Sequence, residues 1–324
     1  MNYKDLSLDK FMIIAALKSP DATDLRSVIH PETLSKLIEL EGTSMMFESG
    51  IGKGINVSDE ALATLGLTCS SRDECLNKGN VIITPSPLTS SETSQIQPGA
   101  SVIGMLNPFY AQDELKAMAA AKLNAVSMEF IPRITRAQKM DVLSSQANLA
   151  GYAAVLEAAQ HLNSALPMMM TAAGTLKPAR VFVIGVGVAG LQAIATAKRL
   201  GAVIEASDVR PAAKEQIESL GAKFVDVPYE TDEEREIAKG VGGYARPMPE
   251  AWMKRQAALV AERAQQADIV ITTALIPGRK PPVLLHSDTV AKMKPGSIVI
   301  DIAAGRGDNG SGNCPLTQAD KIVQ

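Results

Sequence analysis

The chain has 324 residues, a length that suits two domains of ordinary size rather than one. Hydrophobic residues make up 46% of it and charged residues 21%, a balance typical of globular proteins that bury substantial cores. The net charge of −3, with no block rich in Lys and Arg, argues against a nucleic-acid-binding protein.

Metal-ligand and membrane patterns are absent from the sequence. Cys69, Cys75 and Cys314 lack the spacing of metal ligands, and the N-terminus has no signal-peptide pattern. The longest uncharged run, residues 181–197, is broken by glycines and falls short of the roughly 20 apolar residues of a spanning helix. We therefore expect a soluble chain without a metal site.

Short apolar runs and helical patterns alternate through the first part of the chain. Strands are predicted at residues 10–17, 44–49, 80–86, 100–106 and 124–130, and helices at 30–40 and 111–123. This order is typical of an α/β domain with a mostly parallel sheet.

A long helix is predicted at residues 144–163, because apolar residues recur there near the helical period. It lies between two strand-rich halves, and we interpret it as a connector. The second half, from 180–185 to 297–303, has six strand-like segments with intervening helices, typical of a doubly wound nucleotide-binding domain. The fold class is therefore α/β, with two Rossmann-like domains joined by a long helix.

Residues 229–252 interrupt this pattern, since they are first charged, then rich in glycine and then rich in proline. Loops of this length inside compact domains are usually functional or disordered. We expect no regular packed element in this segment, and we expect it to be mobile without a ligand.

The stretch "RVFVIGVGVAGLQAIATAKRL" contains a G-x-G-x-x-G pattern between a predicted strand and a predicted helix. Gly185 permits the tight turn, Gly187 lets the backbone approach a pyrophosphate, and Gly190 lets helix and strand pack closely. The helix that starts near Ala189 points its free N–H groups at the phosphates. We expect a dinucleotide to bind here.

Asp208 ends the next predicted strand, 18 residues after Gly190. A carboxylate in this position accepts hydrogen bonds from the ribose hydroxyls and repels a 2′-phosphate, which selects NAD over NADP. Arg210 could weaken that selection, but we expect its side chain to be solvated. The predicted domains are an N-terminal α/β domain (1–143), the connector helix (144–165), an NAD-binding Rossmann domain (166–305) and a C-terminal segment (306–324) that returns toward the first domain.

A polar cluster, Arg133, Gln138, Asp141 and Ser144, precedes the connector helix. We expect these side chains to face the cleft between the domains, where donors and acceptors of this kind suit the carboxamide of nicotinamide. The alternative is a capped helix start, with Asp141 and Ser144 bonded to free N–H groups. His30, His161 and His286 are scattered, and cap or core roles are expected for them rather than general-base catalysis.

Six segments, among them "PRITRAQKMDVLSSQANLAGYAAV", "GGYARPM" and "ITTALIPGRKPPVL", resemble the NAD(H)-binding domain of proton-translocating NAD(P) transhydrogenase. The resemblance runs collinearly from about Ser101 to Ala303, is poor over the first 95 residues, and extends to the related alanine dehydrogenases.

The resemblance implies a role for each matching residue. It assigns Gln138, Arg133 and Asp141 to catalysis and, with Ser144, to the nicotinamide, its ribose and the adjoining phosphates. The dinucleotide residues that it implies are Gly185, Gly187, Val188, Ala189, Gly190, Asp208, Val209, Arg210, Thr273, Ala274 and Leu275. It also implies that Tyr244, on the 229–252 loop, closes over bound NADH.

The resemblance further implies direct hydride transfer between NADH and NADP⁺, with NADP(H) on a partner subunit. It implies membrane-spanning and NADP-binding partner subunits, a homodimer, and a cytoplasmic location on the inner face of the plasma membrane. Two alternatives remain open: an alanine dehydrogenase-like oxidoreductase, although "VIITPSPL" and "VIGMLNPFYA" lack the Lys and His of that enzyme, and a non-catalytic NAD-binding paralogue.

Overall fold

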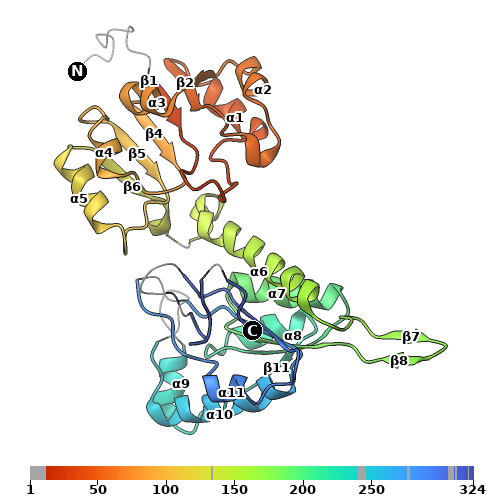
Figure 1. Cartoon of the computed structure of the whole chain (residues 1–324). Coiled ribbons are helices and arrows are strands. Elements are labelled where there is room, and N and C mark those ends of the chain that lie inside the picture. The colour runs from red at the N-terminus through yellow and green to blue at the C-terminus, as the bar shows by residue number, and fades with distance from the viewer. Residues whose placement is uncertain are drawn as a thin grey trace. The chain divides into compact units, whose positions relative to one another are not determined.

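The protein forms two compact units, Met1–Val142 and Leu143–Gln324, in a computed structural model (Figure 1). The structure describes residues 12–132, 134–239, 246–275, 278–305, 310, 312–319 and 321–324.

The first unit contains a parallel sheet with the strand order β3-β2-β1-β4-β5-β6. Its strands are β1 (Met12–Ala16), β2 (Thr43–Glu48), β3 (Thr68–Ser70), β4 (Val81–Thr84), β5 (Ser101–Gly104) and β6 (Asn124–Ser127). The chain moves outward from β1 in one direction and resumes at β4 in the other. The strand order therefore reverses between β1 and β4, which defines the switch point of this sheet.

Helices cover both faces of the first sheet. Alternate residues of β1 serve the two faces: Ile14 packs with α1 (Pro31–Ile38) and α2 (Asp59–Thr64), and Ala15 packs with α3 (Arg72–Lys78) and α5 (Gln112–Ala120). The remaining helical elements are α4 (Ser90–Thr93) and 3₁₀ turns at Lys53–Ile55, Met128–Phe130 and Thr135–Met140. Burial of both faces explains why the strands read as apolar runs rather than as alternating patterns.

The second unit has a parallel sheet with the order β11-β10-β9-β12-β13. Its strands are β9 (Arg180–Ile184), β10 (Val203–Ser207), β11 (Lys223–Phe224), β12 (Ile269–Thr272) and β13 (Ile298–Asp301). The order reverses between β9 and β12, so ligands are expected at the carboxyl ends of these two strands.

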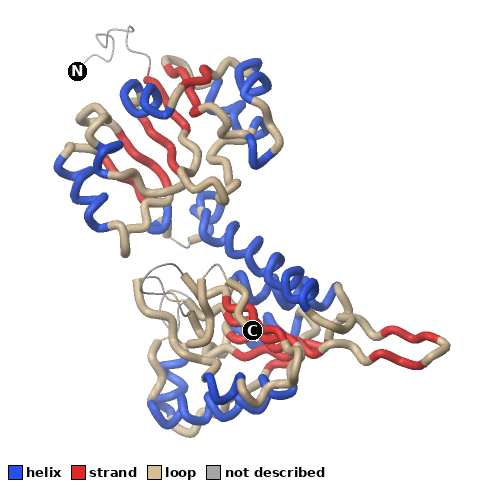
Figure 2. The backbone as a smooth tube through the Cα atoms, in the orientation of Figure 1, coloured by secondary structure: helices blue, strands red, loops and turns tan. Residues whose placement is uncertain are grey.

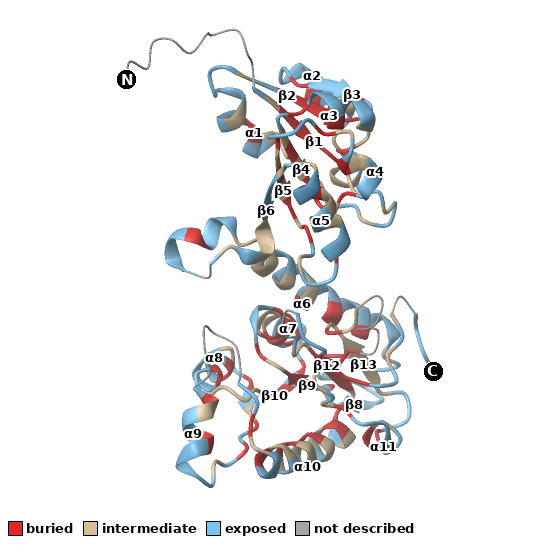
Figure 3. Ribbon diagram, turned by 90° about the vertical axis from the view of Figure 1, so that its left-hand side faces the viewer, coloured by how far each residue is buried: buried red, intermediate tan, exposed pale blue. Residues whose placement is uncertain are grey.

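The helices of the second unit also form two layers around buried strands (Figures 2 and 3). On one face α6 (Val142–His161), α7 (Val188–Arg199) and α8 (Ala213–Ser219) pack against the sheet. On the other face lie α10 (Glu250–Gln266) and α11 (Ser287–Val290). The predicted α/β class, with parallel sheets and a long helix at the junction of the halves, is confirmed.

Two expectations about the second half are wrong. The sheet has five strands rather than six, among the described residues. The segment 229–252 is not without regular structure, because α9 (Asp232–Ala238) forms within it and α10 begins before it ends. Glu234 of α9 is buried and ion-pairs with Arg255 of α10 at 2.7 Å, and this contact attaches α9 to the unit.

A hairpin, β7 (Met169–Thr171) and β8 (Gly174–Leu176), follows α6 and was not predicted. Figure 1 shows it projecting from the second unit, and every one of its residues is exposed.

Candidate functional site

The glycine turn follows β9 at the switch point of the second sheet. Gly185 has φ +86°, in the left-handed region, and a Cβ atom on it would lie 2.9 Å from the backbone nitrogen of Ala274. Its own N–H donates to Ser207 O at 2.9 Å. Both the backbone angle and the close approach of β12 therefore require glycine here.

Gly190 and Gly187 differ in their surroundings. A Cβ atom on Gly190, in the first turn of α7, would lie 2.2 Å from Gly185 O, so glycine is needed for α7 to pack on the turn. A Cβ atom on Gly187 would meet nothing within 4 Å, and no side chain caps the start of α7. Open space above uncapped N–H groups is the arrangement that accepts an anion.

The start of α7 also contacts α6. A Cβ atom on Gly151 of α6 would lie 2.1 Å from Ala189 O, so the two helix backbones touch at this point. Ala189 is buried, whereas Val188 is 38% exposed at the rim of the turn. Ser144 lies in the first turn of α6, in the same unit.

Asp208 lies just past the end of β10, with its side chain only 7% exposed. Its carboxylate accepts a hydrogen bond from Val186 N at 2.7 Å and pairs with Arg210 at 3.0 Å. The bond to this carboxylate raises the pKa of Arg210, and the expectation of a solvated Arg210 is wrong. The neighbouring Val209 has a carbonyl that accepts from Tyr229 Oη at 3.1 Å.

The end of β12 forms the opposite side of the turn. Thr273 donates through Oγ1 to Gly185 O at 2.7 Å, and Ala274 lies against Gly185. The buried side chain of Asn313 accepts from Ala274 N at 3.0 Å and donates to Ala274 O at 2.9 Å. Leu275 is 52% exposed. Sequence reasoning missed Asn313, because no motif marks an amide that binds a distant backbone.

The predicted nicotinamide residues are divided between the two units. Gln138 is exposed in the 3₁₀ turn Thr135–Met140, and Asp141 follows that turn in the first unit. Arg133 and Tyr244 lie outside the described residues. The roles of this group, and the return of the C-terminal segment toward the first domain, stay predictions.

The three histidines have local partners or end positions. His30 caps α1 by accepting from Glu32 N at 3.3 Å, and His161 bonds Glu157 at 3.0 Å within α6. His286 is the N-cap residue of α11. These positions suit cap and surface roles.

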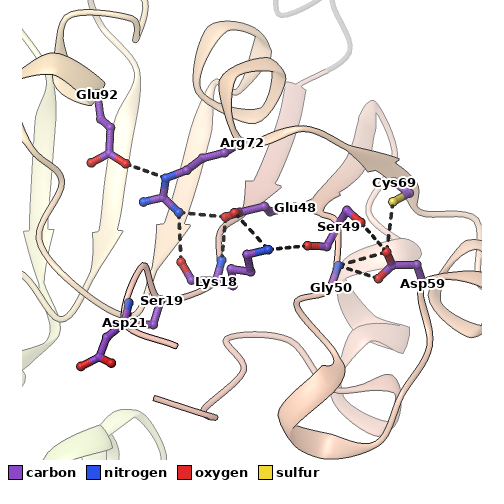
Figure 4. Close-up of polar contacts among 10 residues, drawn as sticks. All are labelled: Lys18, Ser19, Asp21, Glu48, Ser49, Gly50, Asp59, Cys69, Arg72 and Glu92. Carbon is purple, nitrogen blue, oxygen red and sulfur yellow. Dashed lines mark hydrogen bonds and ion pairs between the residues drawn. The ribbon is translucent and has the colours of Figure 1, made fainter. Parts of the chain in front are cut away.

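An ion-pair cluster lies at the carboxyl ends of the strands of the first sheet (Figure 4). Arg72 Nη1 bonds Glu48 at 2.8 Å and Lys18 O at 3.0 Å, and Arg72 Nε bonds Glu92. Burial alone would raise the pKa of Glu92, but the Thr89 N–H and Arg72 outweigh burial and lower that pKa. The charges of this cluster thus pair with one another.

Asp59 is the centre of the neighbouring contacts in Figure 4. It accepts from Ser49 Oγ at 2.7 Å and from Gly50 N at 2.9 Å, and Cys69 Sγ lies 3.6 Å away. Burial and the Asp59 charge raise the pKa of Cys69, which disfavours the reactive thiolate form. Cys69 is therefore unsuited to act as a nucleophile.

Among the described residues, no group of His, Cys, Asp and Glu side chains could hold a metal ion. None of the helices in the described part of the chain has the length and apolar character needed to cross a membrane.

Comparison with known proteins shows similarity along almost the whole chain. The family described as "Alanine dehydrogenase/PNT, N-terminal domain" matches residues 20–150, and its C-terminal counterpart matches residues 154–324. The first of the parts that make up NAD(P) transhydrogenase subunit alpha in Rhodospirillum rubrum is 47% identical over 318 residues, which cover 96% of this chain and 81% of that protein. The match includes most of the first 95 residues, so the expected weakness there is wrong.

Two further proteins separate the branches of this family. The solved transhydrogenase from Sinorhizobium meliloti is 43% identical, with a TM-score of 0.82, over 96% of this chain and 83% of that one. Alanine dehydrogenase of Mycolicibacterium smegmatis is 23% identical, over 88% of this chain and 70% of that protein.

Proposed function

We infer that this chain is the NAD(H)-binding part of an NAD(P) transhydrogenase, because it belongs to the alanine dehydrogenase/PNT family. Within the family it is far more similar to transhydrogenase alpha subunits, which are NAD(H)-binding oxidoreductases, than to alanine dehydrogenases. The Rhodospirillum rubrum relative is named as one part of an alpha subunit, which implies further subunits.

The observation that carries this proposal is the glycine turn beside Asp208 at the switch point of the second sheet. The free space at Gly187 and the uncapped N–H groups of α7 fit a pyrophosphate, and Asp208 fits the adenosine ribose. Thr273, Ala274 and Leu275 would border the adenosine from the end of β12.

At the other end of the cofactor, Arg133, Gln138, Asp141 and Ser144 would orient the nicotinamide ring, and Tyr244 would contact it. Bound NADH supplies a hydride at C4 of its nicotinamide. The residues of this chain would hold that ring facing the ring of NADP⁺ and exclude water. Since no substrate heteroatom loses a proton, this reaction needs no general base, which suits histidines placed in a helix cap, an ion pair and a helix start.

The proposed partners follow from the reaction. A second subunit would carry NADP(H), and a membrane-spanning subunit would couple hydride transfer to proton translocation. This chain would then lie on the inner face of the plasma membrane through those subunits rather than through a helix of its own.

The structure does not favour alanine oxidation by this chain. In "VIITPSPL", Thr84 is buried and donates to Ser86 O at 2.7 Å, and in "VIGMLNPFYA", Asn107 has an N–H that donates to Glu129. Neither segment offers a side chain for proton transfer at neutral pH. A non-catalytic NAD-binding paralogue differs from our proposal only in turnover, which the first experiment measures.

Substitution of Asp208 by Asn tests the cofactor assignment. The wild-type protein should bind NADH much more tightly than NADPH, and Asp208→Asn should weaken NADH binding by about tenfold, because hydrogen bonds to a charged acceptor are lost. Titration of NADH fluorescence measures both affinities. Asp226→Asn, an exposed carboxylate of the same unit, is the matched control and should bind like wild type.

The same preparations, mixed with an NADP-binding subunit, should transfer hydride from NADH to NADP⁺. Equal affinity for NADH and NADPH, or no effect of Asp208→Asn, would contradict the cofactor assignment. Tight NADH binding without hydride transfer would favour the non-catalytic paralogue.

A homodimer is supported by two exposed apolar surfaces of the second unit. The hairpin region exposes Met168, Met169, Met170 and Leu176, and α6 exposes Leu149, Tyr152 and Leu156 at helical spacing. An isolated two-stranded hairpin is marginally stable in water, so this hairpin needs a packing partner. A second copy would supply it and cover the apolar side chains.

Charged substitutions test the dimer. Met170→Glu and Leu149→Glu should each shift the mass measured by sedimentation equilibrium from that of a dimer toward that of a monomer, because burying an unpaired carboxylate is costly. Lys177→Ala, an exposed change beside the hairpin, should leave the dimer intact. A wild-type protein that sediments as a monomer at all concentrations would disprove self-association.

A further inference from the structure

The carboxylate of Asp208 already accepts four hydrogen bonds from the protein. Oδ1 accepts from the backbone N of Arg210 at 2.8 Å and from its Nε at 3.0 Å. Oδ2 accepts from Val186 N at 2.7 Å and from Arg210 Nη2 at 3.0 Å. A carboxylate offers about four lone-pair sites, so the acceptor capacity of Asp208 is used.

The side chain of Arg210 bridges Asp208 and the glycine turn. Its Nη2 also donates to Val186 O at 3.0 Å, one residue after Gly185. The guanidinium is three-quarters buried, with its side chain 25% exposed. It therefore spans the space between the turn and the carboxylate, which is the space that the proposed adenosine ribose needs.

We propose that Arg210 determines cofactor specificity by competing with the adenosine ribose of NADH for Asp208. This inference rests on the proposed function. The Val186 N–H and the Arg210 N–H keep their bonds to Asp208 when NADH binds, and the two side-chain bonds of Arg210 are exchanged for the two ribose hydroxyls. Arg210 then turns outward and lies beside the 2′ position.

The two roles of Arg210 act in opposite directions for the two cofactors. For NADH, displacing the guanidinium costs affinity, although the cost is small because a partly exposed ion pair contributes little. For NADPH, the displaced guanidinium is a cation that pairs with the 2′-phosphate and offsets repulsion from Asp208. Arg210 thus narrows the difference in affinity that Asp208 creates.

Replacement of Arg210 by alanine tests this proposal. Arg210→Ala should bind NADH about threefold more tightly and NADPH about threefold more weakly than wild type, as changes of this size follow from a weak ion pair. Fluorescence titration of each cofactor with the full chain measures the affinities without turnover. Lys254→Ala removes one exposed positive charge from the same unit and should leave the ratio of affinities unchanged.

Arg210→Gln is the second variant, since it keeps most of the side-chain volume and removes the charge. It should change both affinities in the same directions as Arg210→Ala. If both variants bind NADH and NADPH more weakly, or as wild type does, competition at Asp208 is disproved while the cofactor assignment stands. If the wild-type protein binds no NADH, the proposed function itself fails.

Discussion

Replacement of Gly190 by alanine is expected to abolish NADH binding and to lower the free energy of unfolding by about 1–3 kcal/mol. The new Cβ atom would lie 2.2 Å from Gly185 O, a backbone atom that cannot rotate away. Either α7 or the turn must then move, and the N–H groups of α7 lose their position at the proposed pyrophosphate. Thermal denaturation and NADH fluorescence titration measure the two effects.

Gly187→Ala is the matched comparison, because the same added methyl group meets nothing within 4 Å. Its thermal stability should equal that of wild type, while NADH binding weakens because the methyl group enters the space of the pyrophosphate. A Gly190→Ala protein with normal stability and normal NADH affinity would show that α7 can shift without consequence. The close packing of α7 on the turn would then have no role in binding.

The core of the second unit was predictable because local signals and fold rules agree there. Apolar strand, glycine turn, helix, strand and acid occur in the order that a doubly wound sheet requires, and the structure places Asp208 beside the turn. The number of strands was less certain, because apolar runs of a few residues do not distinguish a strand from a packed loop.

Several short elements of the first unit have a sequence signal other than hydrophobic periodicity. Ser71 with Glu74 and Thr89 with Glu92 form capping boxes at the starts of α3 and α4. These helices have seven and four residues, too few to show a period. Local capping chemistry, rather than hydrophobic spacing, would have located them.

Other features depend on contacts that no local pattern encodes. Helix α9 lies in a segment whose charges suggested an exposed loop, but Glu234 finds Arg255 across 21 residues of sequence. Arg210 was expected in solvent, yet the fold places Asp208 and Val186 O within its reach. In both cases tertiary pairing decides the position of a charged side chain.

Asn313 is the clearest site residue of this kind, and its replacement by alanine is expected to weaken both folding and NADH binding. The side chain is fully buried and bonds Ala274 N, Ala274 O and, at 2.8 Å, Pro282 O. Asn313→Ala leaves these backbone groups without a partner, and each buried unsatisfied group costs about 1–3 kcal/mol. A loss of about 3 kcal/mol in the free energy of unfolding is therefore expected.

The effect on binding arises because Ala274 borders the glycine turn, with its nitrogen 2.9 Å from the Cβ position of Gly185. Without Asn313 the end of β12 is free to move away from the turn, and NADH affinity should fall by about tenfold for a loss of 1.4 kcal/mol. Urea denaturation and fluorescence titration measure the two quantities. Asn77→Ala, which removes one exposed bond to Asp73 O in the first unit, should change stability by less than about 0.5 kcal/mol and leave binding unaltered. If Asn313→Ala loses stability but keeps wild-type NADH affinity, the amide supports the fold alone and the end of β12 does not position the cofactor.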